Sequence, residues 1–384
     1  MQKIISEVFD LNQSERIENI LNRYPYLKDV LAGKIPVILW PAANMSRLAA
    51  KKLREHGIEV LGFGDSNQKL HGKYIEGLNV FSSDQILESF KDTPILIAST
   101  IYDSAITEHL SEIGIKKIIP VGVMNTMLPD VFISREHFNG LSDILNDFNR
   151  EKIVFAKDIF ADEISKQVFI NKLLFYVTQQ KSYLDKIYSA NKIYFDIDFV
   201  KISDNECVVD AGAYIGDTFL DYVKFCGDKF KSYYAFEPDD LNFKELEKLA
   251  VAYGSRLHAI QAGISNQSGY LNFEGDNGTS SKLTSQTLEN TKKIKVVKLD
   301  EYIDDDFHPS YIKMDIEGAE TDALDGSKMI IKKYNPKLAI SVYHHPRDLW
   351  ELPLLIHKLN PDYRLYLRHY SREVADTVCY AFIE

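Results

Sequence analysis

Two short stretches of the C-terminal half carry side chains that can move protons, "YIKMDIEGAE" (311–320) and "VYHHP" (342–346). Asp315 and Glu317 stand in the first stretch and His344 in the second. A positioned carboxylate or imidazole can take a proton from a reacting hydroxyl, which speeds a reaction by about 10²–10⁴-fold. We therefore predict that all three face a reacting molecule. His344 is predicted to be a general base or a clamp for the acceptor, with a purely structural histidine as the alternative, and which of the three residues is the base stays open.

The same side chains raise the question of a metal ion. His345 and His369 add two more imidazoles near the predicted strand ends. However, no two histidines have the local spacing of a zinc-binding pair such as H-x-x-x-H. We predict no metal. The acid that follows, Glu320, is interpreted as charge complementation of a helix N-terminus.

A second candidate site lies in "VVDAGAYIGDT" (208–218). An apolar run ends at Asp210, two glycines follow, and helical spacing then resumes. Glycines let the backbone approach a ligand closely, and the next helix offers unpaired N–H groups. Glu237 in "AFEP" comes about 20 residues later, which is the spacing of an acid that accepts hydrogen bonds from ribose hydroxyls. This indicates an adenosine ribose, with an ordinary strand-to-helix turn as the alternative.

The elements that must position these residues alternate between strand and helix. Short apolar runs separate helical stretches over 34–123 and again from 193, which predicts parallel sheets. The run "VFINKLLFYV" (168–177) is apolar nearly all round, so a helix there is buried on several sides. We expect four parts: a helical lead-in (1–33), a smaller doubly wound Rossmann-like domain (34–123), a helical connector (124–192) and a second α/β domain (193–384).

The end of the chain identifies the second domain's architecture. The predicted strands at 363–370 and 376–384 are separated by a short turn, so they must be antiparallel. A mostly parallel sheet with an antiparallel strand at its end is the Rossmann-like sheet of class I methyltransferases. The turn "GAYIGD" is also not the G-x-G-x-x-G of a dehydrogenase. The spacing between the glycine turn and Glu237 fits the ribose of NAD and that of S-adenosylmethionine equally. The antiparallel strand and the form of the glycine turn favour S-adenosylmethionine.

The motifs "VVDAGAYIGDT", "AFEP", "KLDEYI", "IKMDIEGAE" and "SVYHHPRDLWELP…YRLYLRHY" together resemble the FkbM family of S-adenosylmethionine-dependent methyltransferases over about 193–384. The resemblance implies an O-methyltransferase. The cofactor-binding residues that it implies are Asp210, Gly212, Tyr214, Gly216, Thr218, Glu237 and Gly263. Many members carry Asn where this chain has Tyr214. Asp300 in "KLDEYI" is interpreted as a helix N-cap.

The first domain offers less chemistry. Asp65 stands where a ribose-binding acid would, but the turn "WPAANMS" (40–46) has no glycine, so a pyrophosphate is not expected there. A role in homodimer formation or acceptor recognition is predicted instead. By analogy, the acceptor is a sugar, a glycan or another small polyhydroxylated molecule. The stretch "GDNGTSSKLTSQ" (275–286) is either a lid over the acceptor or a surface excursion.

Bulk properties limit the classes of function. The chain has 384 residues, three distant cysteines and a net charge of −11, which excludes a disulfide scaffold and disfavours nucleic acid as a partner. No apolar stretch approaches the roughly 20 residues of a membrane span. We therefore expect a cytoplasmic enzyme without membrane contact. The alternatives are a non-catalytic nucleotide- or sugar-binding regulatory protein and an NAD-dependent oxidoreductase.

Overall fold

A computed structural model describes residues 13–99, 102–128, 130–131, 144, 147–196, 201, 203–227, 229–275, 281–284, 291–302 and 307–383. The chain divides into two compact units. Unit 1 comprises residues 1–150, 170–187 and 371–375, and unit 2 comprises 151–169, 188–370 and 376–384. Each unit is described by itself.

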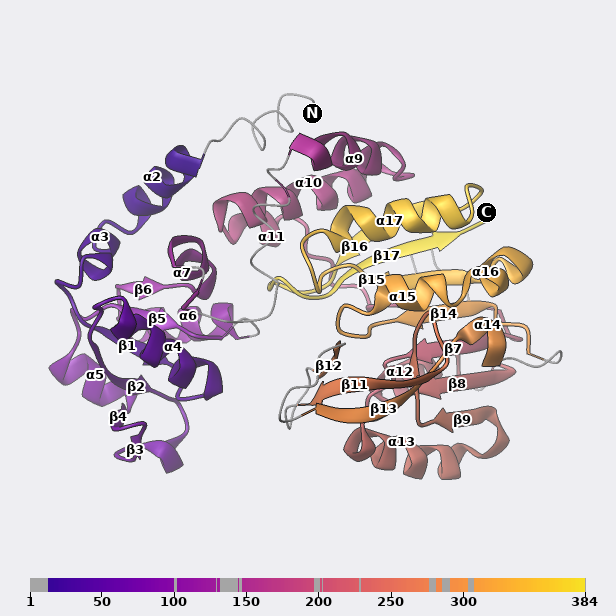
Figure 1. Cartoon of the computed structure of the whole chain (residues 1–384), viewed down its shortest axis with the longest axis horizontal. Helices are drawn as coiled ribbons and strands as arrows, with labels where there is room; N and C mark the ends of the chain where they lie inside the picture. The colour runs from indigo at the N-terminus through magenta and orange to yellow at the C-terminus, as the bar shows by residue number, and fades with distance from the viewer. Residues whose placement is uncertain are drawn as a thin grey trace. The chain divides into compact units, whose positions relative to one another are not determined.

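Unit 1 contains a six-stranded sheet in the order β3-β4-β2-β1-β5-β6 (Figure 1). All neighbours are parallel except the β3–β4 pair. The strands are β1 (Val37–Trp40), β2 (Val60–Gly64), β3 (Tyr74–Ile75), β4 (Leu78–Phe81), β5 (Ile95–Ile97) and β6 (Ile118–Ile119). β1 and β5 are buried along their whole lengths, as expected for central strands of a parallel sheet.

The helices of unit 1 lie before, between and after these strands in the chain. They are α2 (Gln13–Arg23), α3 (Leu27–Leu31), α4 (Asn44–Glu55), η1 (Gln68–Leu70), α5 (Ser83–Ser89), α6 (Asp103–Glu112), α7 (Val121–Met127) and α11 (Ser182–Asp185). The carboxylate of Asp65 accepts hydrogen bonds from the backbone N–H of Ala42 at 2.9 Å and of Asn67 at 2.7 Å. Asp65 therefore stabilises the glycine-free turn after β1 by a hydrogen bond.

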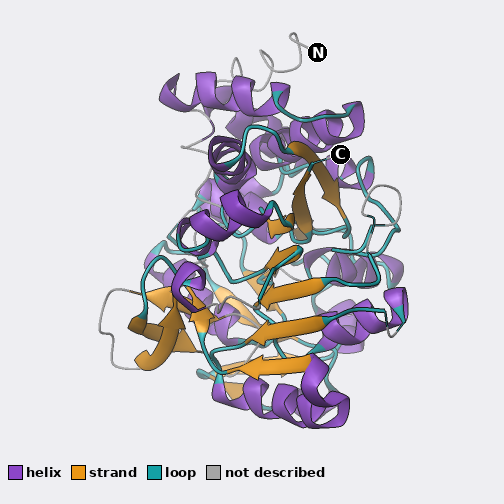
Figure 2. Cartoon of the chain, turned by 90° about the vertical axis from the view of Figure 1, so that its right-hand side faces the viewer, coloured by secondary structure: helices purple, strands orange, loops and turns teal. Residues whose placement is uncertain are grey.

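Unit 2 contains a seven-stranded sheet in the order β16-β17-β15-β14-β7-β8-β9. Figure 2 shows its strands side by side with helices along them. The strands are β7 (Cys207–Ala211), β8 (Ser232–Phe236), β9 (Leu257–Ile260), β14 (Tyr311–Met314), β15 (Lys337–Ser341), β16 (Arg364–His369) and β17 (Thr377–Phe382). β17 is antiparallel to both of its neighbours, and the other pairs are parallel. The predicted antiparallel end of the sheet is confirmed.

Helices of unit 2 follow its strands. They are α12 (Asp217–Cys226), α13 (Asp240–Tyr253), η2 (Gly254–Arg256), α14 (Leu299–Tyr302), α15 (Glu320–Asp325), α16 (Lys328–Tyr334) and α17 (Asp348–Leu359). Phe219 of α12 packs edge-on against Tyr233 of β8, with ring centroids 4.9 Å apart. Asp300 lies in α14, but the helix that it caps is α16. Its carboxylate accepts hydrogen bonds from the backbone N–H groups of Met329 and Ile330 in α16.

Two further helices precede unit 2's sheet in the chain, α9 (Asp147–Asp158) and α10 (Glu163–Thr178). The boundary between the two units falls inside α10. Val168, Phe169, Ile170 and Leu173 are all buried, which confirms the predicted helix with apolar residues on several sides. In the part of the chain that the structure describes, no helix is long and apolar enough to cross a bilayer.

A four-stranded sheet in the order β10-β13-β11-β12 was not predicted. Its strands are β10 (Gly263–Ile264), β11 (Gly269–Gly275), β12 (Ser281–Thr284) and β13 (Thr291–Val297). Most of the predicted lid at 275–286 lies outside the described residues, and only its first residue and 281–284 fall in strands. Lysine, threonine and glycine are frequent in these strands, so their sequence gives little apolar signal.

Candidate active site

Unit 2 contains a cavity of about 440 Å³ where the carboxyl ends of β7, β8 and β14 meet. This is the edge at which ligands of doubly wound sheets bind, and the volume suits a small organic molecule. The predicted site residues that line it are Gly212, Tyr214, Thr218, Glu237, Gly263, Asp315 and Glu317. The structure therefore brings both predicted groups, the glycine turn and the acids after β14, into one cavity.

The glycine turn after β7 requires glycine for steric reasons. Gly212 has φ +78°, and a Cβ placed there would lie 1.9 Å from the backbone oxygen of Asp315. Gly216 has φ +89°, and a Cβ there would lie 2.5 Å from Cδ2 of Leu249. Gly216 does not belong to the described lining of the cavity. Gly216 thus lets the turn pack closely on α13, and its contact with a ligand stays a prediction.

Glu237 ends β8 and reaches back to the glycine turn. One carboxylate oxygen accepts a hydrogen bond from the backbone N–H of Tyr214 at 2.9 Å, and the other from that of Asp239 at 2.8 Å. Burial raises the pKa of Glu237 to about 7. A carboxylate has about four acceptor positions, and the side chain of Asn242 also hydrogen-bonds to this one, so one position remains for a ligand's hydroxyl group. The side chain is therefore arranged as a hydroxyl acceptor in the cavity wall.

Asp210 requires a correction, because it does not belong to the described lining of the cavity. It is fully buried and stands directly opposite Lys313 in the β7–β14 register. The ammonium of Lys313 lies 2.9 Å from the Asp210 carboxylate and donates to the backbone oxygen of Gly212 at 2.7 Å. Tyr233 donates to the other carboxylate oxygen at 2.7 Å. Asp210 therefore supports the turn from behind instead of touching a ligand.

Asp315 follows β14 and is held by phenols on both sides. Tyr194 donates to Oδ2 at 2.7 Å, and Tyr343 donates to Oδ1 at 3.0 Å. Burial raises the pKa of Asp315, but the charges of His344 and Lys313 outweigh it and hold this pKa below its usual value. Asp315 is therefore a carboxylate at neutral pH, with its two oxygens oriented separately.

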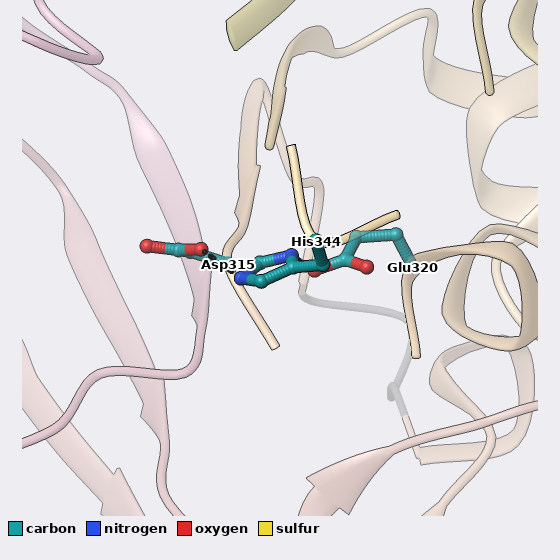
Figure 3. A group of neighbouring side chains, drawn as sticks. All are labelled: Asp315, Glu320 and His344. Carbon is teal, nitrogen blue, oxygen red and sulfur yellow. Dashed lines mark ion pairs between the residues drawn. The ribbon is translucent and has the colours of Figure 1, made fainter. Parts of the chain in front are cut away.

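His344 also requires a correction. It is 2% exposed and outside the described lining of the cavity. Its Nε2 lies 3.3 Å from Oδ1 of Asp315 and its Nδ1 lies 3.0 Å from Oε1 of Glu320 (Figure 3). Burial lowers the pKa of His344, but the neighbouring carboxylates raise it to about 10. An imidazolium cannot accept a proton, so the predicted role as general base does not fit this geometry.

The same three residues have the composition of a metal site, since each offers a ligand atom within 4.8 Å of the others. Figure 3 shows the imidazole lying between the two carboxylates. Because each nitrogen faces a different carboxylate, the ring occupies the space in which an ion would sit. Glu320 Oε1 also accepts from the backbone N–H of Ile316 at 2.8 Å. Asp315, His344 and Glu320 therefore form an ion triad, and we assign no metal to them.

Strained backbone concentrates at the cavity. Seven described residues other than glycine have positive φ, and four of them line it: Tyr194 (+65°), Tyr214 (+49°), Glu317 (+58°) and Asp376 (+61°). Such conformations cost of order 1–3 kcal/mol each and cluster at functional sites. Strain therefore supports this cavity as the functional site.

The lining residues that were missed from the sequence include Tyr194, Tyr343 and Asp376. Tyr194 and Asp376 come from segments with no recognisable motif, so no signal marked them. Tyr343 immediately precedes His344, and its place beside the predicted base was the only indication. Conversely, His369 is buried against Thr377, with Nδ1 2.9 Å from Oγ1, and is not in the described lining.

Comparison with known families matches residues 210–374 to the methyltransferase FkbM domain. Residues 210–374 are therefore similar to an FkbM methyltransferase domain. The predicted resemblance is confirmed, and with it the prediction of an enzyme that transfers methyl groups. Residues 33–119 match the C2185-like N-terminal domain. Among curated proteins, no sequence matches this chain.

A solved structure shows the same fold. Methyltransferase FkbM from Methylobacillus flagellatus is 24% identical, with 97% of this chain and 100% of that chain covered and a TM-score of 0.71. This confirms the predicted α/β fold with its Rossmann-like methyltransferase sheet. An rRNA methylase from Streptococcus thermophilus is 13% identical over 54% of this chain and 96% of its own, with a TM-score of 0.31. A SAM-dependent methyltransferase from Aquifex aeolicus is 13% identical, with 53% of this chain and 99% of that chain covered and a TM-score of 0.30.

Proposed function

We propose that this FkbM-domain chain transfers the methyl group of S-adenosylmethionine to a hydroxyl of a sugar, glycan or other polyhydroxylated molecule. The observation that carries the proposal is one cavity lined by Glu237, which follows β8, and by Asp315, which follows β14. The first acid suits a ribose, and the second suits an acceptor hydroxyl. Two substrates must meet in one site for a direct transfer, and this cavity offers both kinds of group.

The residues present fit the cofactor. Gly212 lets the turn lie closer to the backbone after β14 than any side chain would allow, and Gly212 itself lines the cavity. Glu237 is 6% exposed and keeps acceptor capacity for a ribose hydroxyl. Gly263 and Ile264 line the cavity from the strand that follows β9, where an adenine would lie. When bound, S-adenosylmethionine supplies an electrophilic methyl group on a positively charged sulfur.

On the acceptor side, we assign different roles to Asp315 and Glu317, two of the acids that line the cavity. Asp315 is fixed by Tyr194 and Tyr343 and orients the acceptor hydroxyl by accepting a hydrogen bond. Glu317 accepts the proton that the hydroxyl releases. Holding the reacting groups in line can contribute roughly 7–11 kcal/mol, and the base adds about 10²–10⁴-fold. His344 is a positioning residue in this scheme, because it touches Asp315 and not the cavity.

The charge of the cavity wall favours an uncharged acceptor. Six carboxylates line it, and the two lysines that line it, Lys192 and Lys313, are paired with Asp221 and Asp210. An anionic acceptor would meet like charges here, whereas hydroxyl groups can donate to carboxylates. Tyrosine rings from three segments add apolar surface of the kind that packs against a sugar face. These features support a neutral polyhydroxylated acceptor.

The first experiment is calorimetric titration with S-adenosylmethionine, S-adenosylhomocysteine and NAD, followed by transfer of labelled methyl groups to a panel of neutral sugars and their phosphates. We expect micromolar binding of the first two ligands, none of NAD, and label in neutral sugars. Glu317→Gln should lower turnover about 10²–10⁴-fold while S-adenosylhomocysteine still binds. Binding of NAD alone would overturn the cofactor assignment, and label only in phosphates would overturn the acceptor class.

A further inference from the structure

The cavity includes residues that precede the matched methyltransferase domain. Lys192, Ile193, Tyr194 and Phe195 line it, although the domain begins at residue 210. Tyr194 is the member of this group that reaches Asp315. We propose that Tyr194 is a positioning residue that fixes the Asp315 carboxylate for methyl transfer. This inference rests on the proposed function and adds a residue from outside the recognisable domain to its site.

The first support is the geometry of the carboxylate. The Tyr194 hydroxyl donates to Oδ2 of Asp315 at 2.7 Å, and Tyr343 donates to Oδ1 at 3.0 Å. A carboxylate with one donor on each oxygen cannot rotate about its Cβ–Cγ bond without losing both. Hydrogen bonds to a charged acceptor are short and strong. Tyr194 therefore sets the plane in which Asp315 meets an acceptor hydroxyl.

The second support is the backbone of Tyr194, which has φ +65°. A residue other than glycine keeps this conformation only where its surroundings hold it. Here its N–H donates to the hydroxyl of Tyr380 at 2.9 Å, and its carbonyl accepts from the hydroxyl of Tyr311. Both partners are buried side chains of the seven-stranded sheet. The sheet thus holds Tyr194 in the one orientation that brings its phenol to Asp315.

The residues on either side of Tyr194 are also fixed. Asp196 accepts from the side chain of Asn191 at 2.9 Å and from the hydroxyl of Tyr370 at 2.9 Å. Phe195 packs against the ring of Tyr222, with centroids 5.3 Å apart. These contacts do not involve the Tyr194 hydroxyl. Removing that hydroxyl alone should therefore leave the segment in place.

The ring of Tyr194 has a second neighbour. The ammonium of Lys313 lies 5.3 Å from its centroid, a cation–π distance. Lys313 also donates to the backbone oxygen of Gly212. The ring thus stands between the cation that supports the glycine turn and the carboxylate that faces the acceptor. Its loss would disturb both halves of the site, so the test must keep the ring and remove only the hydroxyl.

The test compares wild type with Tyr194→Phe. The control is Tyr363→Phe, because Tyr363 is a buried residue of the same unit whose hydroxyl donates to the backbone oxygen of Pro336 at 2.6 Å, outside the described cavity lining. For Tyr194→Phe we expect S-adenosylhomocysteine affinity within about twofold of wild type, and kcat about 10–100-fold lower. Crystals with S-adenosylhomocysteine should show a turned Asp315 carboxylate. The control should keep wild-type kcat.

The pH profile separates positioning from a merely structural role. Loss of a donor raises the pKa of the Asp315 carboxyl, so the acid limb of kcat against pH should move to higher pH in Tyr194→Phe and stay in place in the control. Wild-type kcat, an unmoved acid limb and an unturned carboxylate in Tyr194→Phe would overturn the inference. A wild-type chain that neither binds S-adenosylhomocysteine nor transfers methyl groups would overturn the proposed function, and the inference with it.

Discussion

Nε2 of His344 lies 3.3 Å from the Asp315 carboxylate, so this buried histidine supports an acid that lines the cavity. This pair belongs to a longer row of alternating charges. Asp210, Lys313, Asp315, His344 and Glu320 follow one another as anion, cation, anion, cation and anion. Each buried charge thereby has an opposite neighbour, which is the condition under which charges are tolerated away from water.

The first prediction concerns the charge on His344. Because its pKa in the folded chain is about 10 and its ordinary value about 6.5, the imidazolium stabilises the fold fully below pH 6.5. That stabilisation is lost as the pH rises through about 10. His344→Gln should lose about 3–5 kcal/mol of unfolding free energy at pH 6.5, and the difference from wild type should shrink towards pH 10.

Urea unfolding at pH 6.5, 8.5 and 10 measures this difference. The exposed His308 supplies the control, since His308→Gln should follow the wild-type pH dependence throughout. A constant difference between His344→Gln and wild type over this range would show that the ring is neutral in the folded chain. The role of general base would then return to His344.

The second prediction concerns Glu237 and follows from its pKa of about 7. Ribose hydroxyls donate hydrogen bonds, so they favour the carboxylate over the protonated acid. The ionised fraction rises about tenfold between pH 6 and pH 8, and S-adenosylhomocysteine affinity should rise by about the same factor. Calorimetry at both pH values checks this. Glu237→Gln should bind S-adenosylhomocysteine weakly at both pH values. If its affinity instead changed with pH as in wild type, another group would be responsible for the pH dependence.

The site illustrates what the sequence can and cannot supply. Gly212 and Glu237 were predictable because the conformation and the strand end that place them are local features of the chain. The burial of Asp210 was not, since it depends on the register that sets Lys313 opposite it. The charge of His344 likewise depends on carboxylates from α15 and from the end of β14. Tyr194 reaches the cavity from 121 residues before Asp315, and no local motif marks such a contact.

The same limit applies to the fold. The seven-stranded sheet was predictable because its parallel strands are buried on both faces and are therefore continuous apolar runs. The strands at 269–275 and 291–297 pair antiparallel in a separate four-stranded sheet. Antiparallel strands can have one face towards water, so their sequences contain polar residues. "TKKIKVV" is an example, and it was not recognised as a strand.

The third prediction tests the glycine turn. Gly212→Ala would place a Cβ 1.9 Å from the Asp315 backbone oxygen, so the turn must move. We expect loss of S-adenosylhomocysteine binding and more destabilisation than the roughly 1–2 kcal/mol that a left-handed alanine costs by itself. Gly57→Ala is the matched control, because Gly57 has φ +76° and a Cβ there meets nothing within 4 Å. Thermal unfolding measures how much more Gly212→Ala is destabilised than Gly57→Ala. Equal destabilisation of the two variants would show that the turn can move away from the Asp315 backbone without loss of stability.

The fourth prediction separates the buried Lys313–Asp210 pair from ordinary surface pairs. Lys313→Met leaves the fully buried carboxylate of Asp210 without its cation, which should cost about 3–5 kcal/mol of unfolding free energy. Lys248→Met breaks an exposed pair with Glu245 and should cost no more than about 1 kcal/mol. Adding Asp210→Asn to Lys313→Met should recover part of the loss, because a neutral amide no longer needs a counter-ion. Urea unfolding at pH 7 measures these three variants and the single variant Asp210→Asn. If the double variant were as unstable as the sum of its single changes, Asp210 and Lys313 would act independently, and the row of charges would not extend to the glycine turn.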